Sequence, residues 1–357
     1  MLTPQAIDQL AQSIARLRAQ GIGVVLVTHK LREALRLGDC VTVLRGGRHV
    51  AHLSEEQLAQ LSEAEIEQRV LAAMFGAAAD QPAAESAVLA GAVEPVRVIA
   101  SPARATAAAV LELRDVATRS RIGDVEIAEV VLALHSGEIV GVAGIDGHGQ
   151  RALAEVIAGQ RPCSSGAVRF DGGDVTAADV RARQRLGIRY VTDDRLHEGT
   201  VASLSVALNL VLKRIGERPF WRFGRADSRA IRAEAEARIR EYDIRTPSPA
   251  TRAGTLSGGN IQKILLAREL GEGARCLVVH KPTAGLDLKT VRLVRRALRD
   301  FAASGGSVLL ISTDLDELVE LADRIAVISH GRIVAEVEND GAGVAERVGQ
   351  HMAGAIA

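Results

Sequence analysis

A glycine-rich segment between a predicted strand and a predicted helix carries the first sign of chemistry in this sequence. The apolar run at 138–143 predicts a buried strand, and Gly144, Gly147 and Gly149 follow it before a helix over 152–158. Such a turn directs main-chain N–H groups and the positive end of a helix at one point, which favours binding of an anion. A turn of this kind is also a common structural link, so the segment alone leaves both interpretations open.

The residues after the last glycine depart from the phosphate-binding pattern G-x-x-x-x-G-K-[ST]. Gly144 and Gly149 stand in register with that pattern, but Gln150 occupies the Lys position and Arg151 the Ser/Thr position. Arg151 and the later Lys281 can still hold phosphate charge. Two interpretations therefore stay open for these cations, namely nucleotide binding without turnover and a solvated surface position.

A second glycine-rich element stands at the start of another predicted helix. It consists of Leu256, Ser257, Gly258, Gly259 and Asn260, followed by Gln262 and Lys263. The Ser hydroxyl and the first amides of the helix suit an anion. The alternative is an ordinary Ser cap at the start of the helix, followed by two glycines.

The elements that would position these residues occur twice. Residues 2–53 align with 286–337 without a gap, and the identities include Gly21 with Gly305, Leu26 with Leu310, Glu33 with Glu317 and Asp39 with Asp323. Each copy predicts an amphipathic helix, a buried strand, a short helix, a second strand and a Gly-Arg hairpin turn. In the first copy the buried strand is expected at 24–27 and the second strand at 41–44.

Only the second copy carries a long segment, residues 110–285, before the shared part. An α/β unit without that segment would leave strand edges and apolar faces uncovered. The sequence therefore predicts a first domain, residues 1–76, that is truncated at its start or completed by another chain. An Ala/Pro-rich linker over 77–109 follows, and then a second domain over 110–350.

Composition limits the classes of function. Lys+Arg and Asp+Glu balance at 44 each, which argues against the basic surface that nucleic-acid binding needs. The three cysteines show no CxxC spacing, so neither a metal site nor a disulfide framework is indicated. No apolar run reaches the roughly 18 residues of a membrane-spanning helix, and the N-terminus is too polar for a signal peptide. A reducing cytoplasm is the expected environment.

Taken in order, the motifs resemble the ATP-binding subunits of ABC transporters. Residues 256–260 resemble the ABC signature motif, and Thr192-Asp193-Asp194-Arg195 resembles the PEDR-like segment of twin-cassette subunits from bacterial importers of simple sugars and nucleosides. The resemblance implies an α/β fold, a P-loop NTPase-like ABC ATPase domain. It implies a complete second cassette, with a helical subdomain at about 195–270, preceded by the C-terminal fragment of a first cassette.

In such subunits each ATP lies between the Walker motifs of one cassette and the signature of the other. The resemblance assigns His29 (switch position), Asp287 (D-loop) and the signature to one site, in which His29 and Asp287 take the catalytic parts. The second site has lost its consensus residues, which are replaced by Gln150, Arg151, His280, Lys281, Thr313 and Thr3. Nucleotide contacts are implied for Leu256, Ser257, Gly258, Gly259, Asn260, Gln262, Gly144, Gly147, Gly149, Gln150 and Arg151.

The resemblance implies the energy-coupling subunit of an importer for a simple sugar or nucleoside, with ATP and Mg²⁺ as cofactors. Its implied partners are membrane permease subunits, a substrate-binding protein reached through the complex, and another ABC cassette, at the cytoplasmic face of the membrane. Alone, the chain is expected to hydrolyse ATP poorly or not at all. The alternative is a non-hydrolysing pseudo-cassette or decayed fragment that completes or regulates a partner ATPase. A soluble ABC protein acting on the ribosome or DNA is disfavoured by the PEDR-like segment.

Three questions stay open at this stage. The transported molecule is chosen by the permease and binding protein, so this sequence does not reveal it. The missing first part of copy one fits a start-site error, a split gene or a real loss. The patch at Phe220 and Trp221 fits either a permease contact or a local hydrophobic plug.

Overall fold

The computed structural model describes residues 4–27, 34–35, 37–45, 48–62, 65–66, 69–70, 73, 108–119, 125–341 and 343–352. It divides the chain into two units, residues 1–97 and 98–357, which we describe separately. The predicted site residues His29 and Thr3, and nearly all of the predicted linker, lie outside the described residues. No helix in the described ranges is long and apolar enough to cross a bilayer.

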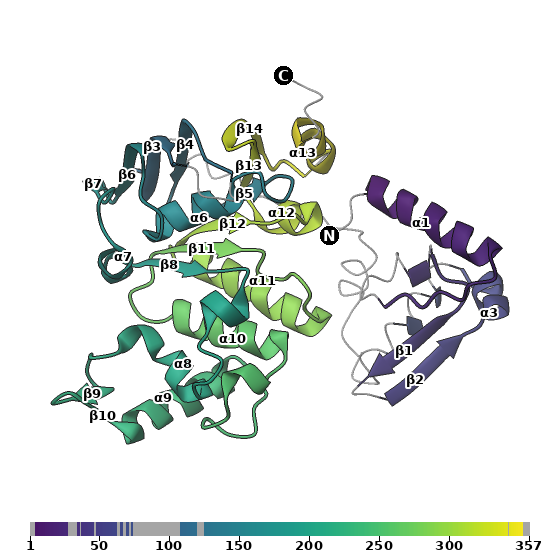
Figure 1. The fold of residues 1–357 in the computed structure, drawn as a ribbon, viewed down its shortest axis with the longest axis horizontal. Coiled ribbons are helices and arrows are strands. Elements are labelled where there is room, and N and C mark those ends of the chain that lie inside the picture. Colours follow the sequence, from purple (N-terminus) through teal and green to yellow (C-terminus); the bar gives the residue numbers. More distant parts are fainter. Residues whose placement is uncertain are drawn as a thin grey trace. The chain divides into compact units, whose positions relative to one another are not determined.

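A six-stranded sheet forms the centre of the second unit (Figure 1). Its order is β14-β13-β5-β12-β11-β8, formed by Arg332–Glu338, Arg324–Ser329, Ile139–Ala143, Ser307–Ile311, Cys276–His280 and Ile188–Val191. All neighbours pair in parallel except β14, which is antiparallel to β13. The short Val, Ile and Leu runs of the central strands are buried on both faces, as expected for a parallel sheet covered on both sides.

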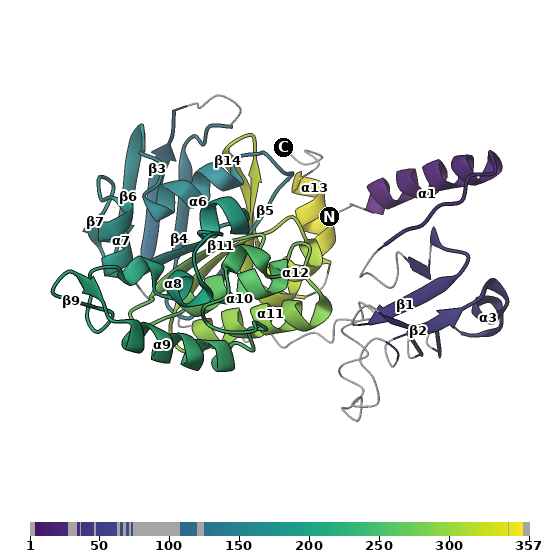
Figure 2. The ribbon, with the colours of Figure 1, turned by 60° about the horizontal axis from the view of Figure 1, so that its bottom comes forward.

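One face of this sheet packs against α6 (Gln150–Ala158) and a second, antiparallel sheet (Figure 2). That sheet has the order β4-β3-β6-β7, formed by Val130–Leu134, Leu111–Ala117, Ser165–Phe170 and Gly173–Asp174. The opposite face packs against helices α11 (Leu288–Ala303), α12 (Leu315–Leu321) and α13 (Val344–Met352). The two apolar clusters hold the parallel strands in place, so the loops at their carboxyl ends are firmly positioned.

Residues 195–270 form a helical part with an apolar cluster of its own, in the segment where the sequence predicts a helical subdomain. It contains a π-helix (Arg195–Gly199), α8 (Val206–Leu210), a β9–β10 hairpin (Trp221–Arg222 and Arg225–Ala226), α9 (Ser228–Glu241) and α10 (Gly258–Glu269). Helix α7 (Val180–Leu186) connects the antiparallel sheet to β8. The start of α10 belongs to this helical part, whereas the glycine-rich loop before α6 follows a strand of the parallel sheet.

The first unit has elements that match those of the second after the shift of the repeat. Helix α1 (Pro4–Ala19) is as long as α11, at 16 residues each, and the hairpin β1–β2 (Val41–Arg45 and Arg48–Leu53) matches β13–β14. A short helix, α3 (Glu55–Gln60), follows the hairpin and begins with a capping box at Ser54. The hairpin packs on a small apolar cluster that includes Val41, Val43 and Leu53.

The predicted buried strand at 24–27 is wrong. Residues 22–27 have no strand hydrogen-bonding pattern, and Val25 and Val27 are 90% and 92% exposed. In the part of the first unit that the structure describes, no strand lies beside this segment. An apolar run of this kind becomes a buried strand only when neighbouring strands pair with it, which is the physical reason for the error.

Candidate functional site

The glycine-rich loop lies between the end of β5 and the start of α6. Gly147 and Gly149 have φ of 85° and 107°, which side chains other than glycine rarely adopt. The first helical N–H with a main-chain acceptor belongs to Leu153, which donates to Gly149 O at 3.0 Å. The preceding amides of the helix are therefore directed at the loop, as in an anion-binding helix terminus.

Gln150 lies inside this loop, because its side chain is only 3% exposed. Its Nε2 donates to Ile145 O at 2.8 Å, whereas its Oε1 has no hydrogen-bond partner in the described part of the chain. A Cβ on Gly144 would come within 2.7 Å of the same Nε2, so only glycine fits there. A buried polar atom without a partner indicates a place where a ligand or water completes the bonding.

Arg151 is held by carboxylates of its own unit. Its Nε donates to Glu155 Oε1 at 2.8 Å, and its guanidinium also pairs with Glu198. The hydrogen bond to Glu155 is the largest influence that raises the pKa of Arg151. Glu198 in turn accepts a bond of 2.8 Å from the hydroxyl of Thr192, which ties the PEDR-like segment to the glycine-rich loop.

The carboxyl end of β11 places two further basic residues beside the loop. The His280 ring is 3% exposed, and its Nδ1 lies 3.3 Å from Asp193 Oδ1, at the edge of hydrogen-bond distance. This polar contact is the main reason that the pKa of Asp193 falls to about 2. Lys281 Nζ lies 2.7 Å from Asp146 Oδ1 and lowers the pKa of that carboxyl. The predicted residues Gln150, Arg151, His280 and Lys281 are thus brought together.

The second glycine-rich element behaves differently from an ordinary Ser cap. Ser257 begins α10 but its hydroxyl accepts no bond from a helical amide; it accepts from Asn260 Nδ2 at 3.0 Å. Asn260 Oδ1 accepts from Arg245 N at 2.7 Å, so the Asn orients the Ser. Ser257 and Gly258 are exposed, which leaves the start of the helix open to an external anion.

Gln262 and Lys263 have structural contacts. Gln262 is fully buried and accepts a bond of 2.7 Å from Arg195 Nε, while Arg195 also donates to Ala284 O at 2.6 Å. Lys263 Nζ donates to Asp243 O at 2.6 Å. The PEDR-like segment therefore connects α10 to the loop after β11, and the interpretation of Gln262 as a nucleotide contact gains no support from this geometry.

Asp287 caps α11, because its carboxylate accepts from Thr290 N at 3.0 Å and from Thr290 Oγ1 at 2.8 Å. Nearby, the buried Glu317 accepts bonds of 2.6 Å from the hydroxyls of Thr283 and Ser312. Burial is the main cause that raises the pKa of Glu317. Glu317 thus links the loop after β11 to the loop after β12, where Thr313 stands. His29, which the resemblance assigns to the same site as Asp287, lies outside the described residues.

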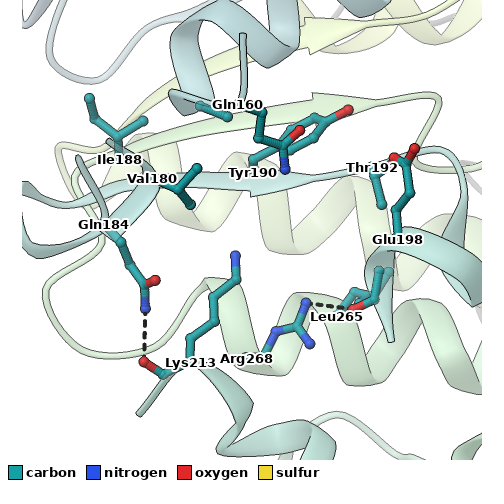
Figure 3. A pocket seen from close by; sticks show the side chains of 12 residues that line it. Gln160, Val180, Gln184, Ile188, Tyr190, Thr192, Glu198, Lys213, Leu265 and Arg268 are labelled. Atoms are coloured by element: carbon teal, nitrogen blue, oxygen red, sulfur yellow. Dashed lines mark hydrogen bonds between the residues drawn. The ribbon is translucent and has the colours of Figure 1, made fainter. Parts of the chain in front are cut away.

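A cavity of about 90 Å³ adjoins the loop site. Figure 3 shows Tyr190, Thr192, Glu198, Lys213 and Arg268 around it. Lys213 pairs with the buried Glu269 at 2.7 Å, and Arg268 donates to Gly199 O at 2.8 Å, so the cations of this cavity are already engaged. Thr192 and Glu198 belong to both places, which makes the cavity an extension of the loop site toward the helical part.

The aromatic segment of the helical part divides into a core residue and an exposed one. Phe220 is 2% exposed and the Arg214 guanidinium lies 4.5 Å from its ring centre, so Phe220 is a local plug. Trp221 is partly buried against the same cluster. Phe223, in the turn between β9 and β10, is 97% exposed. The sequence places all three aromatics in one patch, residues 218–223, and sequence reasoning missed only that Phe223 is its exposed member.

Sequence reasoning also missed the carboxylates that neutralise the loop site. Asp146 stands between the glycines of the loop, and that position is the only local signal for its contact with Lys281. Glu198 lies 47 residues from Arg151, and no pattern in the sequence near either residue predicts this pairing. Both contacts come from the fold.

Comparison with known proteins shows that the second unit is similar to ATP-binding cassettes. Residues 127–284 match the sequence profile of the family described as ABC transporter. A dimeric cassette structure in a post-hydrolysis state with ADP and Pi superposes with a TM-score of 0.56, at 21% identity, over 65% of this chain and 99% of that one. A nucleotide-free cassette from an ABC transporter gives the same TM-score at 21% identity, over 65% and 92%. These likenesses concern the fold.

Curated relatives extend across both units. The glucose import ATP-binding protein TsgD13 of Haloferax volcanii is 36% identical over 99% of this chain and 60% of its own length. The nucleoside import ATP-binding protein NupA of Lactococcus lactis subsp. cremoris is 32% identical over 93% and 61%. The ribose import ATP-binding protein RbsA 1 of Rubrobacter xylanophilus is 32% identical over 94% and 61%. The chain thus spans about 60% of the length of these relatives.

Proposed function

We propose that this chain is the energy-coupling subunit of an importer for a simple sugar or a nucleoside, because residues 127–284 match the ABC transporter family profile and the second unit has the fold of solved ATP-binding cassettes. The names of the curated relatives support this class of cargo, since they comprise glucose, nucleoside, guanosine and ribose importers. They divide between sugars and nucleosides, so they do not select one molecule. None of them is named as a non-hydrolysing regulator, and the pseudo-cassette alternative has no support.

The observation that carries the proposal is the contrast between the two glycine-rich elements. The start of α10 is exposed, and the Ser257 hydroxyl is held by Asn260 without capping the helix. The loop before α6 lacks the consensus Lys, and its cations are engaged by carboxylates. We infer that this chain gives its signature, residues 257–260, to a competent ATP site whose Walker motifs belong to another cassette.

Three further parts of the proposal rest on the repeat and on the sequence pattern. We propose that the first unit is the C-terminal part of a first cassette, which the match of α1 and β1–β2 with α11 and β13–β14 supports. We propose that His29 and Asp287 serve the same ATP site as the signature. The partners are membrane permease subunits at the cytoplasmic face, and through them a substrate-binding protein.

The test is transport-coupled ATP hydrolysis by the complete complex in proteoliposomes, formed with a permease and binding protein with which this chain co-purifies. Ser257→Ala should lower turnover by about 10²–10³-fold, because it removes a positioned group that contacts the phosphates. Gln150→Ala is the matched control in the other glycine-rich element and should leave turnover within about threefold of normal. Turnover that falls with Gln150→Ala and survives Ser257→Ala contradicts the proposal.

The β9–β10 turn supplies a candidate permease contact. We propose that the exposed Phe223 inserts into a permease surface, since exposed aromatics are typical anchors of interfaces. Phe223→Ser should weaken association with the permease by roughly tenfold or more and leave the thermal unfolding of the free chain unchanged. Equal association of both forms in co-purification at matched expression contradicts this contact.

A further inference from the structure

The metal-facing positions of the glycine-rich loop carry basic residues. In phosphate-binding loops of this type, a Ser or Thr hydroxyl after the Lys and an Asp at the end of a neighbouring strand hold Mg²⁺. Here those two positions are Arg151 and His280. Across the described ranges, no group of three or more His, Cys, Asp or Glu side chains is suited to a metal ion. Mg²⁺ therefore does not fit this site.

Two cations, Lys281 and Arg151, nevertheless stand beside the loop at the places where a metal would stand, each paired with carboxylates. Lys281 Nζ lies 2.7 Å from Asp146 of the loop, and Arg151 reaches from the first turn of α6 to Glu155 and Glu198. The carboxylates that hold these cations belong to the protein itself. The basic residues and their partners form one connected set, because Asp193 feels the charges of His280, Lys281 and Arg151 together.

The loop also keeps groups that a phosphate would satisfy. The amides before Leu153 precede the first main-chain bond of α6, and the buried His280 Nε2 has no protein partner in the described part of the second unit. The Lys281 side chain is 18% exposed, but its partner Asp146 is 71% exposed and can therefore leave the pair for water. A phosphate can therefore take Lys281 while Asp146 turns to solvent.

We propose that this loop binds the phosphates of a nucleoside di- or triphosphate without a divalent cation, with Lys281 supplying the charge that Mg²⁺ supplies elsewhere. The inference rests on the proposed function only in taking the loop as a nucleotide site. It makes the second site a nucleotide holder rather than a hydrolytic centre, because phosphoryl transfer in this class requires the metal.

The proposal predicts that Mg²⁺ opposes binding. A magnesium ion on the β- and γ-phosphates would approach the Arg151 guanidinium, and like charges a few ångströms apart repel strongly in a partly desolvated site. ATP without Mg²⁺ carries more negative charge than Mg–ATP, and this charge attracts Lys281 and Arg151 more strongly. Nucleotide binding that weakens when Mg²⁺ is added is the reverse of what is expected for a site with metal ligands.

The first experiment is calorimetric titration of the intact chain with ATP, once in EDTA and once in excess Mg²⁺ at equal ionic strength. We expect binding to be at least about tenfold tighter in EDTA, a difference that one modest charge interaction provides. Tighter binding with Mg²⁺ overturns the proposal, and so does an absence of binding in both buffers. Neither result affects the Ser257→Ala test of the complex, which concerns the other glycine-rich element.

A matched pair of variants separates this role from general charge effects. Lys281 follows β11 and pairs with Asp146, whereas Arg275 precedes β11 and pairs with Asp171 at the opposite end of the strand. Lys281→Ala should weaken metal-free ATP binding by about tenfold or more, and Arg275→Ala should leave it unchanged. Equal weakening by both variants, or none by Lys281→Ala, overturns the assignment.

A reversal variant gives a result that misfolding cannot imitate. Arg151→Thr combined with His280→Asp restores the two metal ligands and puts a second carboxylate beside Asp193. We expect this protein to bind ATP more tightly with Mg²⁺ than in EDTA, the opposite of the unaltered chain. Retention of the original preference for EDTA by a variant with an unchanged circular dichroism spectrum overturns the proposal.

Discussion

Strand β12 and residues 23–27 occupy matching positions of the repeat, yet only β12 is a buried strand. In β12, Val308, Leu309 and Leu310 are fully buried between β5 and β11. Their counterparts Val24, Val25 and Leu26 are 41%, 90% and 39% exposed. The apolar pattern is the same in both places, so the difference comes from the neighbouring strands.

The helix and the hairpin that flank this segment are, in contrast, formed in both copies of the repeat. Helix α1 forms as α11 does, and Ile14 is buried as Leu298 is. In the hairpins, Val43 and Val327 are both buried. A helix closes its hydrogen bonds within itself, and a hairpin closes them with the adjacent strand. A parallel strand needs partners from distant parts of the chain, and for that reason this element differs between the two copies where the described helix and hairpin do not.

The largest expected difference between the copies is in amide hydrogen exchange. Amides of residues 308–311 are bonded within the sheet and should open only with unfolding of the second unit, whereas amides of residues 24–27 should exchange as in an open chain. We expect at least about a 10³-fold difference in protection, measured by mass spectrometry of matched peptides. Equal protection of the two segments would show that 24–27 is paired in solution.

The second largest difference between the copies is expected in the free energy of unfolding after side-chain truncation. Leu310→Ala should lower the free energy of unfolding by about 2–5 kcal/mol, because it leaves a cavity in the sheet. Leu26→Ala should change it by no more than about 0.5 kcal/mol. Urea unfolding followed by far-UV circular dichroism measures both, and the single tryptophan, Trp221, reports on the second unit. A large loss of unfolding free energy in Leu26→Ala would contradict the conclusion that residues 24–27 do not form a buried strand.

The hairpins should respond alike. Val43→Ala and Val327→Ala each remove a buried Val side chain and should each cost about 1–3 kcal/mol in their own unit. Exchange protection of the β1–β2 and β13–β14 amides reads out each unit separately. If only Val327→Ala lowers protection, the hairpin of the first unit is not held by its apolar cluster.

The smallest effect concerns the pH dependence of stability. Burial raises the pKa of Glu317, so the folded state binds its proton more tightly than the unfolded state does. The associated stability is present below the unfolded pKa and is lost as the pH rises through the folded pKa. Glu317→Gln should flatten this decline by up to about 1.4 kcal/mol per pH unit, measured as melting temperature from pH 4 upward.

An exposed carboxylate in the same helix provides the control for this prediction. Asp316→Asn should leave the same profile unchanged, because the Asp316 side chain is exposed to water. A flattening of similar size from both substitutions would show that the pH dependence of stability does not come from the burial of Glu317 between the two loops.

The sequence was sufficient to predict the elements whose bonding is local. Helix α1, the β1–β2 hairpin, the glycine turn before α6 and the start of α10 all lie where their patterns predict them. The segment 24–27 was predicted wrongly, because an apolar run shows the tendency of a strand without showing its partners. The pairs of Lys281 with Asp146 and of Arg151 with Glu198 join residues 135 and 47 positions apart. Contacts of that separation follow from the fold, and no pattern along the chain reveals them.

The position of β5 in the middle of the parallel sheet has a consequence for the order of events during synthesis. Both neighbours of β5 come from later in the chain, and the loop after β5 touches the β13–β14 turn, where Gly331 N donates to His148 O at 2.9 Å. At ordinary elongation rates, about 180 residues take roughly 10 to 40 seconds to make. Throughout that interval the glycine loop exists without the surroundings that shape it. The glycine-rich loop site is therefore among the last features of the chain to take shape, although its sequence lies in the first part of the second unit to be translated.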